Sequence, residues 1–105
     1  MSQQACELCG RCVPDLTKHH LIPRTRHSNR RNKRRFSRDE VRNRIAWLCP
    51  PCHANLHEQF SNKELEQELN TIDALRNHPV IRRFTRWIAR RPPGTRVPIR
   101  SWKGD

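Results

Sequence analysis

The chain has 105 residues, of which only 33% are hydrophobic, and its 22 Lys and Arg residues outnumber its 10 Asp and Glu residues to give a net charge of +12. No apolar run approaches the roughly 18 residues that a membrane span needs, so no span is predicted. Residues 1–5 are short and polar and do not resemble a signal peptide, so we expect a cytoplasmic protein. The strong positive charge favours a polyanionic partner, and we expect nucleic acid, not a membrane.

Two Cys-x2-Cys pairs lie far apart in the chain, at residues 6–9 and 49–52. Gly10 follows the first pair and suits a tight turn. Four thiolates at these spacings form the tetrahedral set that zinc prefers, and so small a core commonly requires a structural metal. We therefore predict a structural zinc. The fifth cysteine, Cys12, stands at the same spacing from Cys9 and could be an alternative ligand, but we favour a free thiol. The predicted zinc ligands are Cys6, Cys9, Cys49 and Cys52.

Short strands and a basic loop are predicted between the two cysteine pairs. A strand is expected over residues 16–22, followed by a loop at 24–38 that contains no acid before Asp39. A capped helical turn should begin at Ser37, and a second strand should cover 45–48. Charge runs are often only solvated, but this loop lies between the two halves of the candidate site, so we expect it to contact phosphates. The predicted contacts are Arg24, Arg26, Arg30, Arg31, Arg34 and Arg35.

From the second cysteine pair to about residue 91, the chain is predicted to be mostly helical. The second cysteine pair opens a helix that should run to about residue 60, and a capping box at 61–64 opens the next. Further helices are expected at 71–77 and from Pro79 onward. The last helix has an apolar stripe, which most simply packs against the domain. The stripe consists of Val80, Ile81, Phe84, Trp87 and Ile88.

Four histidines form two pairs with complementary geometry. His53 and His57 stand one turn apart on one helix face, so both imidazoles can bind the same cation. His19 and His20 are neighbours on an extended segment and point in different directions. One of them can complete the metal site while the other remains nearby as a base. A phosphodiesterase that uses one metal ion requires this layout.

The two motifs that carry these histidines together resemble a known family. The motif His-His-x-x-Pro-Arg at residues 19–24 and the motif Cys-x2-Cys-His-x3-His at 49–57 are similar to those of HNH endonucleases. Those enzymes have a ββα-metal (His-Me finger) fold, here with an embedded zinc ribbon. The resemblance covers about residues 6–60 and implies the same fold and activity for this chain.

The resemblance also assigns individual roles. It implies that His19, His53 and His57 bind a catalytic metal and that His20 is the general base. The middle Asn of the family corresponds here to Arg44, so the resemblance gives that role to the neighbouring Asn43. A ligand set made of nitrogen atoms suits Zn²⁺, Ni²⁺, Co²⁺ or Mn²⁺ better than Mg²⁺.

The expected fold class is α+β, with a small ββα-metal core, a zinc ribbon of four cysteines and C-terminal helices. We predict one domain over 1–105, made of a core at 6–60, a helical extension at 61–91 and an extended basic tail at 92–105. Its expected function is metal-dependent hydrolysis of phosphodiester bonds in double-stranded DNA, with a structural Zn²⁺ and one catalytic divalent metal. The alternative is a non-catalytic zinc-ribbon module that binds nucleic acid through charge. Only the nuclease explains the two histidine pairs.

Overall fold

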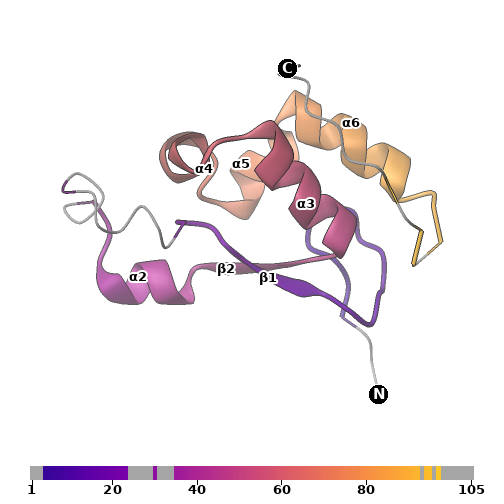
Figure 1. The fold of residues 1–105 in the computed structure, drawn as a ribbon, viewed down its shortest axis with the longest axis horizontal. Helices are drawn as coiled ribbons and strands as arrows, with labels where there is room; N and C mark the ends of the chain where they lie inside the picture. The colour runs from indigo at the N-terminus through magenta and orange to yellow at the C-terminus, as the bar shows by residue number, and fades with distance from the viewer. Residues whose placement is uncertain (1–3, 24–29, 31–34, 93, 96, 98–105) are drawn as a thin grey trace.

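The computed structural model describes residues 4–23, 30, 35–92, 94, 95 and 97, and Figure 1 shows how the elements are arranged. In chain order they are β1 (Thr17–His20), α2 (Arg38–Asn43), β2 (Ile45–Leu48), α3 (Pro50–Gln59), α4 (Asn62–Glu68), α5 (Ile72–Asn77) and α6 (Pro79–Ile88). The fold is mixed α+β, as predicted, with a two-stranded sheet and helices that follow it. No helix in these ranges is both long and apolar enough to cross a membrane.

The two strands pair antiparallel in a register that places Thr17 opposite Leu48 and His19 opposite Ala46. Alternate residues of a strand point to opposite faces, so Thr17 and His19 share one face. Helix α3 follows directly after β2 and contacts β1 (Figure 1). The register therefore sets which residues of β1 face this helix.

Strand β1 is shorter than the predicted strand over residues 16–22. It ends at His20, whose partner Ile45 is the first residue of β2. Helix α2 runs up to Asn43, so only Arg44 remains between the helix and the strand. One further backbone hydrogen bond, from Leu21 N–H to the Arg44 carbonyl at 2.9 Å, ties the chain after β1 to this junction.

Side-chain caps begin the helices where the sequence predicts them. The Ser37 hydroxyl accepts a hydrogen bond from Glu40 N–H at 3.0 Å at the start of α2. At the start of α4, Ser61 and Glu64 form both hydrogen bonds of the predicted capping box, at 3.1 and 3.0 Å. These caps satisfy N–H groups that have no partner within the helix.

One main hydrophobic cluster joins the sheet to the helices. It includes Leu48, Leu56, Leu65 and Leu75, all fully buried. A second, smaller cluster packs α2 beside the end of β1 and consists of Ile22, Phe36 and Val41.

The apolar stripe predicted for α6 is narrower than expected. Ile81 and Ile88 are buried in the main cluster and Phe84 is half-buried, but Val80 and Trp87 are 37% and 42% exposed. Ile81 and Ile88 lie two turns apart on one line of the helix, and Val80 and Trp87 are each one residue away from that line. Only part of the predicted stripe therefore packs against the domain.

Candidate functional site

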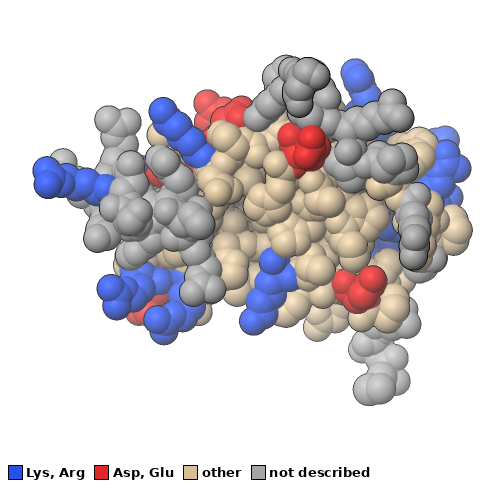
Figure 2. All heavy atoms as spheres, in the orientation of Figure 1, with Lys and Arg blue, Asp and Glu red and all other residues tan. Residues whose placement is uncertain are grey.

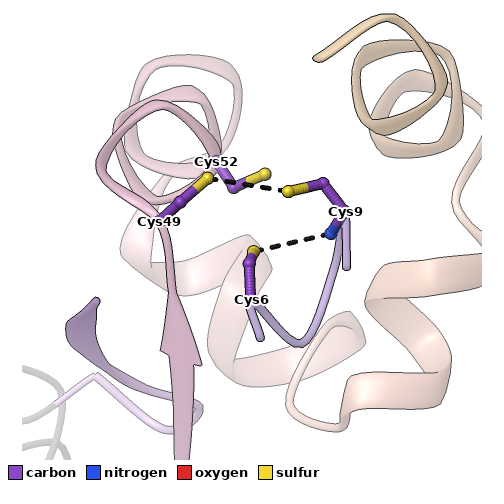
Figure 3. Close-up of side chains that lie close together, drawn as sticks. All are labelled: Cys6, Cys9, Cys49 and Cys52. Atoms are coloured by element: carbon purple, nitrogen blue, oxygen red, sulfur yellow. Dashed lines mark hydrogen bonds between the residues drawn. The ribbon is translucent and has the colours of Figure 1, made fainter. Parts of the chain in front are cut away.

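Four cysteine side chains converge where the start of α3 meets the turn at residues 6–10, here called the knuckle (Figure 3). Their sulfur atoms all lie within 4.8 Å of one another, and the Cys9 and Cys49 sulfurs are 3.8 Å apart. Tetrahedral zinc with Zn–S bonds of about 2.3 Å separates its sulfur ligands by about 3.8 Å. The group could therefore hold a structural metal. This cysteine cluster consists of Cys6, Cys9, Cys49 and Cys52.

The local backbone explains why the first two cysteines point the same way. Gly10 has a φ of +83°, which a glycine adopts without strain, and its N–H donates to the Cys6 carbonyl at 2.9 Å. The Cys9 N–H also donates to the Cys6 sulfur at 3.5 Å. Cys12 pairs with Ala5 in an isolated bridge, and its side chain is exposed outside the cluster.

The thiols of the cysteine cluster differ in pKa. Hydrogen bonds from the thiols of Cys49 and Cys52 lower the pKa of Cys9 to about 6. The close sulfurs of Cys49, Cys6 and Cys9 in turn raise the pKa of Cys52, because several thiolates cannot coexist at this distance without a cation. Metal binding at this cluster must therefore displace protons.

Arg11 is a residue that the sequence analysis did not select. Its guanidinium is buried and donates from Nη2 to the Cys49 sulfur at 3.3 Å. From Nη1 it donates to the carbonyls of Arg91 and Pro92, at 3.3 and 3.0 Å. It thus links the cysteine cluster to the end of α6, and its positive charge offsets the negative charge of the thiolates.

We expect Arg11→Met to lower the free energy of unfolding by about 1–3 kcal/mol, since the Arg91 carbonyl loses its side-chain donor and the Pro92 carbonyl keeps only its hydrogen bonds from Thr95. Chemical denaturation of the metal-loaded protein measures this. Arg11→Lys is the matched control. It keeps the positive charge, but a single ammonium group cannot donate to all three acceptors as the planar guanidinium does, so we expect an intermediate loss of stability. Equal stability of Arg11→Met and the wild type would show that the link is not needed.

Three imidazoles also converge beside α3. Their candidate ligand atoms all lie within 4.8 Å of one another, and the Nε2 atoms of His53 and His57 are 3.1 Å apart. Tetrahedral zinc with Zn–N bonds of about 2.0–2.1 Å separates two nitrogen ligands by about 3.3 Å. His19 comes from β1, and the other two come from α3. This histidine cluster consists of His19, His53 and His57.

His19 is the member of this cluster that most needs a ligand. Its side chain is only 1% exposed, and both ring nitrogens lack a hydrogen-bond partner among the described residues. Burial, followed by the nearby rings of His53 and His57, lowers the pKa of His19 to about 3. Burial also lowers the pKa of His53 and of His57. Neutral imidazoles are the form that binds metal ions, so these three residues fit a divalent cation.

Thr17 lies behind the cluster and was also missed by the sequence analysis. Its Oγ1 donates a hydrogen bond to the Leu48 carbonyl at 3.0 Å. The same oxygen lies 2.8 Å from His53 Nδ1. A lone threonine in a short strand carries no signal in the sequence, because its role depends on a strand pairing 31 residues away.

A hollow of about 290 Å³ opens over the histidine cluster. His20, at the end of β1, also borders the hollow, so all four predicted histidines meet there. The described residues that line it are Lys18, His19, His20, Pro23, His53, His57 and Asn62.

The other predicted site residues are not brought to this hollow by the described part of the chain. Asn43 is exposed at the C-terminal end of α2 and does not line the hollow. Arg30 and Arg35 are exposed. The remaining predicted phosphate contacts, Arg24, Arg26, Arg31 and Arg34, lie outside the described residues.

Comparison with known proteins finds a relative in Bacillus subtilis. The chain is 39% identical over 88 residues to the uncharacterized protein YisB of Bacillus subtilis (strain 168), and the match covers 84% of this chain and 76% of YisB. No protein-family model matches the chain, and no solved structure gives a significant match.

Proposed function

This chain belongs to the same family as YisB, and we propose that it is a metal-dependent endonuclease of the HNH type. The two candidate metal sites support this proposal. Its core would be the ββα-metal arrangement, made here of β1, β2 and α3. The observation that carries the proposal is the buried His19, whose two ring nitrogens lack partners among the described residues and which faces two further imidazoles.

The proposal assigns the two sites different tasks. The cysteine cluster would hold a structural zinc that fixes the knuckle to the start of α3. The residues of the histidine cluster would hold a divalent cation, which when bound stabilises the negative charge that develops on the scissile phosphate. Both clusters draw ligands from the first turns of α3, so the structural site also orients the catalytic one.

The proposed base is His20, because it borders the hollow without belonging to the three-ligand set. A ring nitrogen of His20 would accept a proton from water as its oxygen attacks phosphorus, and the departing sugar oxygen would take a proton from solvent. Lys18 borders the same hollow and is exposed, so its ammonium can contact a neighbouring phosphate. Asn43 remains the predicted middle residue of the motif.

Relaxation of a supercoiled plasmid tests the proposal. We expect zinc-loaded wild-type protein to cut the plasmid when a second divalent ion is added, with higher rates for Zn²⁺, Ni²⁺, Co²⁺ or Mn²⁺ than for Mg²⁺. Activity that strictly requires Mg²⁺ would contradict the nitrogen ligand set and would point to a carboxylate ligand. DNA binding without cleavage under any of these ions would favour a non-catalytic nucleic-acid-binding module.

A further inference from the structure

Helix α6 carries an arginine surface that the proposed function does not use. The surface continues into the two residues that follow Ala89, the C-cap of the helix, and all of its arginines are exposed. In the described part of the chain, none of these guanidinium groups has an ion-pair partner. No Asp or Glu occurs between Asp73 and Asp105. We name it the α6 surface; its arginines are Arg82, Arg83, Arg86, Arg90 and Arg91.

The α6 surface has the shape and spacing of a phosphate-binding site. Arg82 and Arg86 stand four residues apart on α6, which is a rise of about 6 Å, and Arg90 follows four residues later in the turn after the helix. That spacing is comparable to the distance between successive phosphates of a nucleic-acid strand. The surface is also hollowed, with a volume of about 670 Å³ lined by the arginines, Pro79 and Trp87.

Trp87 contributes to the same surface although it is a large apolar residue. It is 42% exposed, and the Arg91 guanidinium lies 4.7 Å from the centre of its ring. A guanidinium held over an aromatic face keeps the donors at its edge free for a phosphate. The opposite side of the helix, at Ile81 and Ile88, is buried, so the arginines point away from the core.

We propose that the α6 surface binds the phosphate backbone of double-stranded nucleic acid, separately from the basic loop that precedes α2. Helices α2 and α6 lie at opposite ends of the molecule in Figure 1, and Lys and Arg side chains gather at both ends in Figure 2. This proposal shares with the proposed function only the class of partner and does not depend on cleavage.

The test compares two double variants that remove the same charge. Arg82→Gln and Arg86→Gln alter the α6 surface, whereas Arg42→Gln and Lys63→Gln alter exposed cations that lie outside both this surface and the basic loop. Zinc-loaded proteins are titrated into a fluorescent DNA duplex without a second metal, at several salt concentrations. We expect the α6 variant to reduce the slope of log affinity against log salt by roughly 0.9 for each phosphate that it no longer binds, and the control to change the slope less.

If the two variants change the salt slope equally, the proposal that the α6 surface binds nucleic acid is overturned. Nucleic acid would then remain the partner of the protein, bound elsewhere. If the wild type binds no duplex at all, this proposal and the DNA-binding part of the proposed function both fail. Vesicles containing anionic lipid form a second arm. Loss of vesicle binding without loss of duplex binding in the α6 variant would identify a membrane surface and overturn the proposal.

A second inference follows independently from Thr17. A hydroxyl has one proton, and the Thr17 hydroxyl donates it to the Leu48 carbonyl. At 2.8 Å from the same oxygen, His53 Nδ1 must then be the donor, which leaves His53 Nε2 unprotonated. That atom is the one that faces His57 Nε2.

We infer that Thr17 is a positioning residue, which holds His53 in the tautomer that directs its Nε2 lone pair into the cluster. Such partners behind a metal-bound histidine fix its ring orientation and its proton. The strand register makes this possible, because Thr17 pairs with Leu48, which immediately precedes Cys49, the N-cap of α3. This inference rests on metal binding at the histidine cluster.

Two measurements test Thr17 without an activity assay. Nitrogen-15 NMR of zinc-loaded protein without a second metal reports the His53 tautomer, which we expect to be Nδ1–H in the wild type and Thr17→Ser, but not in Thr17→Val. Titration with Co²⁺, followed by its visible absorption, should show roughly 10–100-fold weaker binding to Thr17→Val and near wild-type binding to Thr17→Ser. An unchanged tautomer and unchanged affinity in Thr17→Val would overturn the inference. A wild type that binds no Co²⁺ beyond its structural metal would instead overturn the proposed catalytic metal site.

Discussion

Replacing Cys49 by Ser is expected to remove the metal from the cysteine cluster and to unfold most of the chain. Cys49 is fully buried between β2 and α3, and its sulfur contacts both Cys9 and Arg11. Zinc bound by such ligands contributes about 10–16 kcal/mol in small zinc domains, whereas a whole domain is usually stable by only about 5–15 kcal/mol. The free energy lost with the metal should therefore exceed the free energy of unfolding of the domain. Far-ultraviolet circular dichroism and zinc content measure both effects.

Cys12→Ser provides the matched control, because the same atom is replaced at an exposed cysteine outside the cluster. We expect this variant to keep one tightly held zinc per chain and the full helical signal. A Cys49→Ser protein that contains no zinc but retains its helices would show that the metal is not needed for folding.

Replacing His20 by Ala is expected to slow cleavage strongly without changing the fold or the metal content of the protein. The variant should keep its fold, its zinc and its affinity for a second metal, because His20 lies outside both ligand sets. Its cleavage rate should fall at least ~10²-fold, the lower end of what a positioned general base contributes. The measurement is the single-turnover rate of plasmid relaxation with the second metal at saturation.

His57→Ala should behave differently, since it removes one of the three clustered imidazoles. We expect it to lose cleavage and Co²⁺ binding together while the structural zinc remains. If His20→Ala cuts at nearly the wild-type rate and His57→Ala is inactive, the metal site stands and another group bordering the hollow must act as the base. Lys18 would then be the next residue to replace.

The elements and both clusters could be predicted because their signals are local or depend on spacing. The Cys-x2-Cys pairs, the histidines four apart and the Ser61 capping box each fix geometry within one or two turns. The two cysteine pairs were then expected to lie close together in the fold, and all four of their sulfur atoms do lie within one cluster. The residues that support the clusters could not be found in this way.

Thr17 and Arg11 illustrate what the sequence does not contain. Thr17 reaches its partners through the pairing of β1 with β2, and Arg11 reaches carbonyls about 80 residues away at the end of α6. Both are common residue types whose role depends entirely on tertiary contacts. The predicted width of the apolar stripe on α6 was wrong for a related reason. Periodicity indicates which residues lie on the apolar face, but the neighbouring elements decide how many of them are buried.

The division of both clusters between distant segments also fixes the order in which the protein can assemble. During synthesis, Cys6 and Cys9 emerge first but cannot complete a tetrahedral site until Cys52 has followed them. Capturing a metal then closes a loop of about 40 residues, and the same closure brings β1 against β2 and α3. We therefore expect His19 to meet His53 and His57 only after the cysteine cluster has closed. A cell short of zinc would accumulate chains that cannot cut nucleic acid, so the proposed nuclease would stay inactive until its structural metal is supplied.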